Sequence, residues 1–415
     1  MRKKIRKNLM ISALVATMAV SLIGCSPSYG FGGLIHESKE GSTQQDDISQ
    51  TLKNLLPDGA DYVTAKNSNE KQGIIFADIN QDEQKEALVL YQNENKEVHF
   101  IALQEDQDGY HELWDYKTGF LSIDYFDVVD LDGDGKKEIV SGGELPGQQS
   151  LDQLIIYGLE ENELKEKEKI SYEKVLIQTF QDNSNPSLFI LTKESSEELT
   201  ANRYSYEQGN LKLCSSVALY PQAVPENMTV GHLADGVDAV FIDSGIGAHS
   251  MLTEIFTVKD GMLTKIGKEE DGVLMKEYPL YSRDINDDGI IEVGGLYIPN
   301  GYEDAAMAEI PFIHTYNDYK LDGSKEIIEE RYEDEEHKFY ITIPADLYEL
   351  VTVKKIDQGV QLVSVSGGEI LIEVKWKKKD GADPKDSLGE MGDTVFYTDF
   401  NGNMPISADQ FHFME

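Results

Sequence analysis

Short runs of hydrophobic residues recur along the chain, and most have the length of a β-strand. ALVLY (87–91), IVSGG (139–143) and VGGLY (293–297) are examples. In EIFTVKDGMLTKIG (254–267), two such runs flank a polar turn with glycine, which predicts a β-hairpin. Few segments show helical spacing over three turns. The pattern therefore predicts a mainly β protein.

One unit of this pattern repeats about every 50 residues. Its first aspartates are Asp78, Asp130, Asp182, Asp235 and Asp284, and the intervals between them are 52, 52, 53 and 49 residues. A β-prone run follows each one, and a hairpin pattern follows that. A repeat of this length with four antiparallel strands is typical of a β-propeller blade. We expect a β-propeller of about five to seven four-stranded blades, closed into a ring that leaves no exposed sheet edge.

Three of the repeats begin with a box of oxygen-bearing side chains at relative positions 1, 3, 5 and 9. The three sets are Asp78, Asn80, Asp82 and Glu86; Asp130, Asp132, Asp134 and Glu138; and Asp284, Asn286, Asp288 and Glu292. Position 7 offers a backbone carbonyl, from Gln84, Lys136 and Ile290. Ca²⁺ takes six to eight oxygen ligands, so a loop that brings these groups together predicts a calcium site. The alternative is a solvated acidic turn with internal hydrogen bonds and no metal.

Glycine at position 6 would permit the sharp turn that such a loop needs, and Gly135 and Gly289 supply it. The first box has Glu83 there, so we expect its site to be the weakest. An EF-hand is excluded because position 12 carries no acid in any box, and because strands rather than helices follow.

These boxes, each followed by a strand, resemble the FG-GAP/VCBS-type repeats of calcium-binding β-propellers with an integrin α-like arrangement. The resemblance covers roughly residues 70–300. It implies that Ca²⁺ braces the loops between strands and performs no chemistry.

The first 25 residues have the pattern of an export signal. A basic start precedes an uncharged run from Leu9 to Ile23, which is short for a membrane-spanning helix. The ending Leu-Ile-Gly-Cys resembles a bacterial lipobox, which implies a signal peptide over 1–24 and a lipidated Cys25. The alternative is a plain secretory signal. We expect an exported protein that Cys25 anchors to the outer face of the cell membrane, with a flexible tether over 25–50.

The chain is strongly acidic, with 76 acidic and 37 basic residues and a net charge of -39. Such a chain repels phosphate backbones, so nucleic acid is not expected as a partner. It also repels anionic lipids, so the acyl chains must provide the membrane attachment.

No metalloprotease motif, phosphate-binding loop or nucleophile elbow is present in the sequence. We therefore predict a non-catalytic binding or scaffold module for an unknown protein or glycan ligand. The alternatives are a carbohydrate-active enzyme on the same ring and an extracellular sensory accessory protein for a membrane partner. The glycine-rich loop FIDSGIGAHSMLTE offers His249 and Ser250 as candidate ligand contacts, although a hydrogen-bonded loop histidine is the simpler interpretation.

The repeats are expected to occupy residues 51–336. From residue 337 the acidic box is absent and several alternating strands follow. Residues 337–415 are predicted to form a small β-rich C-terminal domain, or else to supply a sixth blade.

Overall fold

The computed structural model describes residues 42–67, 73–147, 151–161, 163–181, 185–193, 198–247, 250–267, 273–379, 384–399, 406 and 409–414. Cys25 and the whole predicted signal peptide lie outside these residues. None of the helices in the described part of the chain is long and apolar enough to cross a bilayer.

Six antiparallel sheets of four or five strands make up most of the described chain, and each is formed largely by consecutive strands. The first sheet contains β1 (Asp61–Tyr62), β2 (Ile74–Ala77), β3 (Glu86–Gln92), β4 (Val98–Asp106) and β5 (Gly109–Lys117). The second contains β6 (Ser122–Val129), β7 (Glu138–Glu144), β8 (Asp152–Glu160) and β9 (Glu163–Tyr172). The third contains β10 (Lys174–Gln178), β11 (Ser187–Lys193), β12 (Leu199–Glu207) and β13 (Asn210–Ala218).

The other three sheets follow in chain order. The fourth contains β14 (Val224–His232), β15 (Asp238–Gly245), β16 (Met251–Lys259), β17 (Met262–Ile266) and β18 (Val273–Lys276). The fifth contains β19 (Val293–Tyr297), β20 (Ile313–Tyr319), β21 (Lys325–Asp334), β22 (Phe339–Ile343) and β28 (Phe411–Phe413). The sixth contains β23 (Val351–Ile356), β24 (Gly359–Ser364), β25 (Ile370–Lys378), β26 (Ser387–Met391) and β27 (Thr394–Tyr397).

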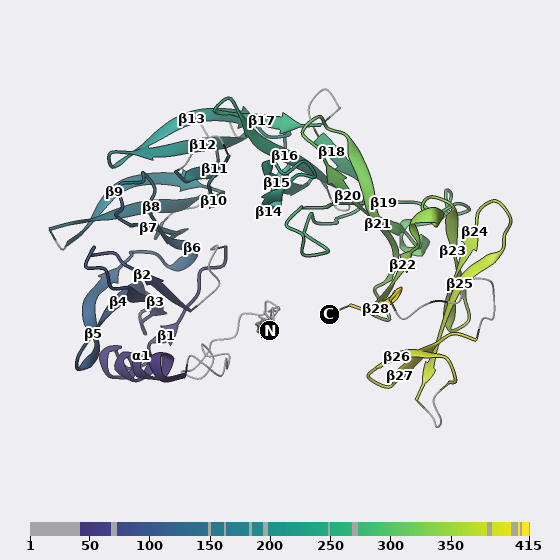
Figure 1. The fold of residues 1–415 in the computed structure, drawn as a ribbon, viewed down its shortest axis with the longest axis horizontal. Coiled ribbons are helices and arrows are strands. Elements are labelled where there is room, and N and C mark those ends of the chain that lie inside the picture. The colour runs from purple at the N-terminus through teal and green to yellow at the C-terminus, as the bar shows by residue number, and fades with distance from the viewer. Residues whose placement is uncertain are drawn as a thin grey trace, which may run out of the picture.

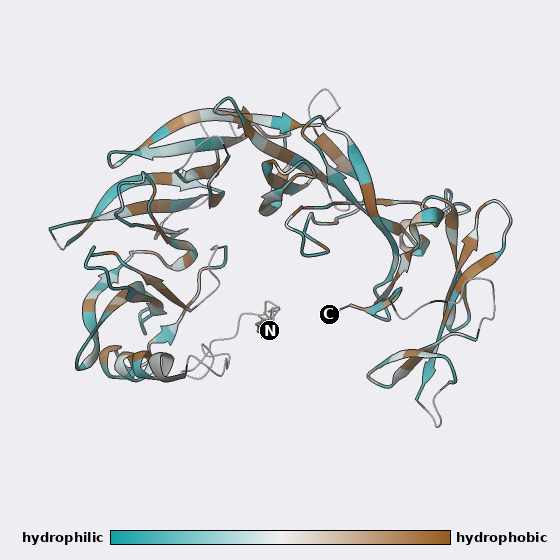
Figure 2. Ribbon diagram, in the orientation of Figure 1, coloured by the Kyte–Doolittle hydropathy of each residue, from teal (hydrophilic) through white to brown (hydrophobic). Residues whose placement is uncertain are grey.

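The six sheets follow one another along an open arc (Figure 1). Each pair of neighbouring sheets shares a hydrophobic cluster. For example, Phe100 of the first sheet packs edge-on against Tyr157 of the second, with ring centroids 6.1 Å apart. Further clusters join the second to the third, the third to the fourth, the fourth to the fifth and the fifth to the sixth. Hydrophobic residues accordingly concentrate on the strands, while the outer loops are polar (Figure 2). Burial of apolar surface between successive sheets is therefore the main stabilising contribution to the arc.

The single α-helix of the described residues, α1 (Ser42–Leu55), covers the free face of the first sheet. Its Ile48 and Leu52 are buried against Val89 and Tyr91 of β3, whereas Leu88 and Leu90 on the opposite face of that strand contact the second sheet. Alternate residues of a strand point to opposite faces, so β3 can supply both layers at once. The helix begins within the stretch that was expected to be a tether, because its buried side chains hold it on the sheet.

The sixth sheet forms the other end of the arc. In the sixth sheet, Val360, Leu362 and Val374 face the fifth sheet. Gln361 and Glu373 alternate with these residues along the two strands. The side chain of Gln361 donates a hydrogen bond to Glu373, and Glu373 is ion-paired with Lys375. The side chains of Gln361 and Glu373 are both already buried. At the opposite end of the arc, α1 covers the face of the first sheet that a last blade would have to meet. The open arc is thus consistent with this cover on the first sheet.

The prediction of a mainly β protein built from repeated antiparallel sheets is confirmed. The expected ring closure is not seen among the described sheets. The expected boundary at residue 337 falls in the turn between β21 and β22, which pair in one sheet.

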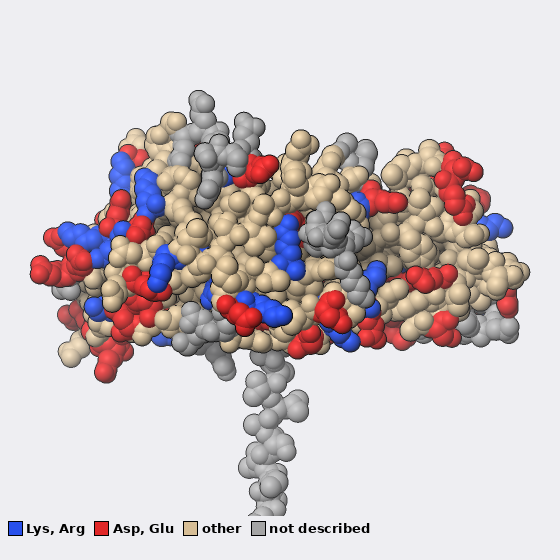
Figure 3. Space-filling model, turned by 90° about the horizontal axis from the view of Figure 1, so that it is seen from above, with Lys and Arg blue, Asp and Glu red and all other residues tan. Residues whose placement is uncertain are grey.

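Charged side chains are mixed on the side of the molecule seen in Figure 3. Acidic groups are frequent at both ends and along the lower edge of this view, with lysine and arginine between them. The absence of nucleic acid as a partner stays a prediction.

Candidate metal centres and a cavity between two sheets

Each acidic box forms the loop that leads into one strand of its sheet, which is β3, β7 or β19. The first joins β2 to β3 and the second joins β6 to β7. The third precedes β19, and its two ends are held together by a bridge between Arg283 and Glu292. The three boxes therefore occupy equivalent places in three sheets, as their repeat in the sequence predicts.

The Asp130 loop is folded around its own carboxylates. Asp130 accepts hydrogen bonds from the backbone N–H groups of Gly133, at 2.7 Å, and Gly135, at 3.0 Å. Asp134 accepts one from the backbone of Lys136 at 2.8 Å. The oxygen-bearing side chains are consequently turned toward the inside of the loop.

The other two loops share most of these hydrogen bonds. The N–H of position 6 donates to the carboxylate of position 1 in both, from Glu83 to Asp78 at 3.1 Å and from Gly289 to Asp284 at 2.8 Å. The N–H of position 5 donates to the side chain of position 3, at 2.9 Å and 3.1 Å. The N–H of position 7, Gln84 and Ile290, donates to position 5, at 2.9 Å and 2.8 Å. Ligation by the carbonyls of Gln84, Lys136 and Ile290 stays a prediction.

The turn at position 6 has a positive φ in all three loops, at 70° for Glu83, 89° for Gly135 and 83° for Gly289. Glycine adopts this conformation readily, and other residues adopt it at a cost. The first loop thus forms the same turn without glycine. Position 4 is also left-handed in each loop, which the sequence analysis did not predict.

The glutamate at position 9 fixes the base of each loop. One of its oxygens accepts the N–H of position 2, at 2.8 Å for Glu86, 3.0 Å for Glu138 and 2.9 Å for Glu292. All three side chains are buried, and Glu86 and Glu292 are fully so. The second carboxylate oxygen of Glu86 and of Glu292 is buried with no hydrogen-bond partner.

Burial raises the pKa of all three glutamates, and it raises those of Glu138 and Glu292 to about 7. The nearby aspartates of each loop add to this effect. Because the folded-state pKa lies above the ordinary value, ionisation of these groups opposes folding as the pH rises from about 4.5 to 7. A divalent cation would favour the ionised form.

The donor set fits a hard cation. In the Asp130 loop, oxygens of Asp130, Asp132 and Glu138 lie within 4.8 Å of one another, the one such acidic group in the described part of the chain. Lys136 is the local counter-charge, with its Nζ 3.9 Å from Asp134. Carboxylate, amide and carbonyl oxygens are the ligands that Ca²⁺ prefers.

The glycine-rich loop FIDSGIGAHSMLTE, which offered His249 and Ser250 as candidate ligand contacts, is only partly described. His249 lies outside the described residues. The backbone carbonyl of Ser250 accepts a hydrogen bond from Ile246 at 3.0 Å, just before β16. Contact of either residue with a ligand stays a prediction.

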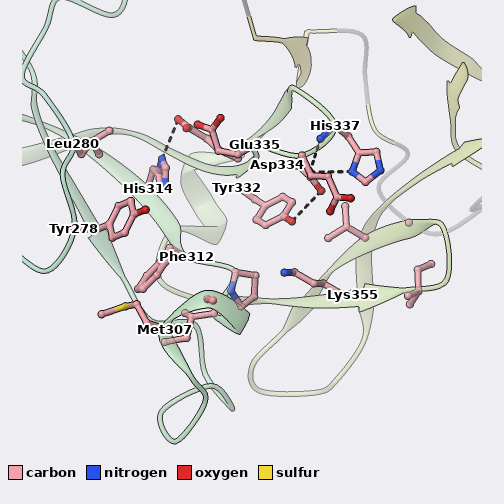
Figure 4. Close-up of a pocket in the computed structure, with 18 of the residues that line it drawn as sticks. Tyr278, Leu280, Met307, Phe312, His314, Tyr332, Asp334, Glu335, His337 and Lys355 are labelled. Carbon is pink, nitrogen blue, oxygen red and sulfur yellow. Dashed lines mark hydrogen bonds and ion pairs between the residues drawn. The ribbon is translucent and has the colours of Figure 1, made fainter. Parts of the chain in front are cut away.

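A cavity of about 660 Å³, which no sequence motif indicated, lies between the fifth and sixth sheets. Figure 4 shows Tyr278, Phe312 and His314 on one side and Asp334 with His337 on the other. Trp376 also lines it, and its ring lies against the imidazole of His337 with centroids 4.1 Å apart.

Asp334 orients His337 within this cavity. The carboxylate lies 3.0 Å from Nδ1 of the ring and accepts the backbone N–H of the same residue at 2.9 Å. It also accepts a hydrogen bond from the Tyr332 hydroxyl at 3.4 Å. Because an ionised carboxylate only accepts, it places the imidazole proton on Nδ1 and leaves Nε2 as a base.

A second charged group lies nearby. Burial alone would raise the pKa of Glu333, but His314 and Arg331 outweigh it and hold that pKa at about 2. The only signal of this cavity in the sequence is the acidic run EDEEH (333–337) between two strands. Apart from Tyr332, the other residues that line the cavity lie roughly 20 to 55 positions away in the sequence, so no local pattern revealed them.

No protein-family model matches the chain, and no curated protein matches it. Among solved structures, an exotype rhamnogalacturonan lyase is 17% identical, with 76% of this chain and 73% of that one covered and a TM-score of 0.32. A rhamnogalacturonan lyase from Bacillus licheniformis is 13% identical, with 76% and 72% covered and a TM-score of 0.32.

The prediction that the protein is not an enzyme is contradicted by this comparison, because the matched structures are enzymes, and we withdraw it. The TM-scores are too low for the likeness to support any particular activity in this chain.

Proposed function

We propose that this protein is an exported calcium-binding protein whose three acidic loops brace an open arc of propeller-type blades. The observation that carries this proposal is the buried glutamate at position 9, with one oxygen unpaired in two of the loops. A buried carboxylate oxygen without a donor is costly, and a bound cation removes that cost.

The proposed location is the outer face of the cell membrane, through a lipidated Cys25. Two acyl chains provide a stable anchor. Extracellular calcium modules often bind in the range of ~10⁻⁴–10⁻³ M, which suits a protein outside the cell. The protein or glycan that it engages there is not identified by the loops.

A calorimetric titration with calcium chloride tests the proposal. We expect saturable binding, a higher melting temperature in calcium and a lower one in EDTA. Glu292→Gln should weaken or remove one site, because it replaces a buried carboxylate ligand with an amide. Asp108→Asn, an equal charge change at an exposed turn in the first sheet, should leave binding unchanged. Absence of both binding heat and a calcium-dependent shift in melting would refute the proposal.

The second candidate function is a carbohydrate-active enzyme acting in the cavity between the fifth and sixth sheets. The oriented Asp334–His337 pair favours it, because such a pair is suited to general-base catalysis. The aromatic side chains of Tyr278, Phe312 and Trp376 offer flat apolar surfaces of the kind that sugar rings contact. A cavity of about 660 Å³ is also large enough for a small ligand.

Incubation of the purified protein with pectic, wall and storage polysaccharides, followed by chromatography of the products, tests this function. We expect a cleaved product with one class, and a loss of at least 100-fold in kcat for His337→Ala. Asp334→Asn should also be impaired, because it weakens the orientation of His337. His111→Ala, on β5 far along the arc, is the matched control. Cleavage that His337→Ala leaves intact would exclude this residue as the base.

A further inference from the structure

The pairing of β19 with β20 places an additional carboxylate beside the Asp284 loop. Val293 pairs with Asn317 in this ladder, so the next residue outward on each strand brings Asp318 opposite Glu292. Asp318 is 7% exposed and Glu292 is fully buried. Each of the two carboxylates has one oxygen that is buried without a hydrogen-bond partner. Two buried acids therefore face each other, and without a cation a hydrogen bond between them needs a proton on one carboxyl group.

The equivalent position differs in the other two loops. In the first sheet, Ala87 pairs with Leu103, which places Gln104 opposite Glu86. The Gln104 amide donates a hydrogen bond to Asp82 of that loop. In the second sheet, Ile139 pairs with Tyr157, and the residue opposite Glu138 is Gly158, which has no side chain. Of the three loops, only the Asp284 loop has a carboxylate at this place.

We propose that Asp318 supplies a further oxygen ligand to the Asp284 loop and raises the affinity of this loop for a divalent cation. This inference rests on the proposed calcium function. Ca²⁺ takes six to eight oxygens, and its affinity rises with the number of charged ligands. Asp318 adds a carboxylate that the repeat in the sequence does not contain. It is already ordered by the strand, so little side-chain entropy is lost when the ion binds.

Asp318 adds a fourth carboxylate to those of Asp284, Asp288 and Glu292. Among the described residues, none of these four carboxylates is ion-paired with a lysine or arginine. In the first sheet the equivalent residue is Gln104, whose neutral amide donates a hydrogen bond to Asp82 instead of adding a charge. The extra charge of Asp318 therefore favours a bound cation at the Asp284 loop.

Calcium titrations of the full-length protein and three variants test this inference. Asp318→Asn should weaken one of the calcium sites at least tenfold, while the number of sites stays the same. Gln104→Glu, which adds a carboxylate at the equivalent place in the first sheet, should tighten the Asp78 loop. Asp304→Asn, an exposed acid of the same sheet region, is the control for net charge and should change neither site.

The outcomes separate this inference from the proposed function. If the protein binds calcium and Asp318→Asn binds it equally well, the role of Asp318 is refuted while the loop sites stand. If no variant and no wild-type protein binds calcium, both proposals fail, and a proton is shared between Glu292 and Asp318. If Asp318→Asn does not fold by circular dichroism, the Gln104→Glu titration decides, since an unchanged Asp78 site would refute the inference.

Discussion

Replacing Lys276 with methionine is expected to destabilise the protein by about 3–5 kcal/mol. Lys276 ends β18, and its ammonium group lies 2.9 Å from Asp243 of β15. The two side chains are 2% and 0% exposed. Removing the lysine leaves an ionised carboxylate buried without its cation, which is the costly way to break such a pair.

The surrounding hydrogen bonds show why the pair is held so firmly. Asp243 also accepts bonds from Thr253 at 2.5 Å, from Asn227 at 3.1 Å and from the backbone of Ser282 at 2.7 Å. Burial would raise the pKa of Asp243, but Lys276 and these donors outweigh it and lower that pKa. This network joins β18 to β15 and holds Ser282, just before the Asp284 loop, against the fourth sheet.

Urea unfolding followed by circular dichroism measures this effect. Lys212→Met, which breaks an exposed pair with Glu207, is the control and should change stability little. The double variant Asp243→Asn with Lys276→Met should lose less than the sum of the two single variants, because the two residues interact directly. A cost below about 1 kcal/mol for Lys276→Met would show that the pair is not needed for stability.

Replacing Leu52 with alanine in α1 is expected to cost about 2–5 kcal/mol. Leu52 is 2% exposed and packs with Ile48 on the free face of the first sheet. The pair Ile48→Asp with Leu52→Asp should have a larger effect, because it releases the helix and exposes Val89, Tyr91 and their neighbours. An exposed apolar sheet face of this kind promotes association between chains.

Thermal melting and sedimentation velocity measure the two consequences. We expect a lower melting temperature for Leu52→Ala and self-association of the double aspartate variant. Asn54→Ala, on the exposed side of the same helix, should behave as the wild type. If the double variant stays monomeric and equally stable, α1 does not act as a cap on the arc.

The sequence alone determined the repeated unit and the position of its acidic loops. These features are local: positions 1, 3, 5, 6 and 9 lie within nine residues, and their hydrogen bonds form inside one turn. For the same reason the strands after Asp78, Asp130 and Asp284 could be predicted from alternation and turn residues. The left-handed turn at Glu83, where the sequence lacks the usual glycine, shows that neighbouring carboxylates can impose it.

Only the tertiary structure decided how the units are joined and which distant residues meet. In the open arc, α1 covers the face of the first sheet against which a last blade would have to pack to close a ring. The sixth sheet, which would be that blade, begins about 300 residues after α1 in the sequence. Asp318 joins the Asp284 loop through a strand register, and Trp376 reaches His337 through packing between two sheets. Such contacts depend on the summed burial of many side chains, so no short stretch of sequence encodes them.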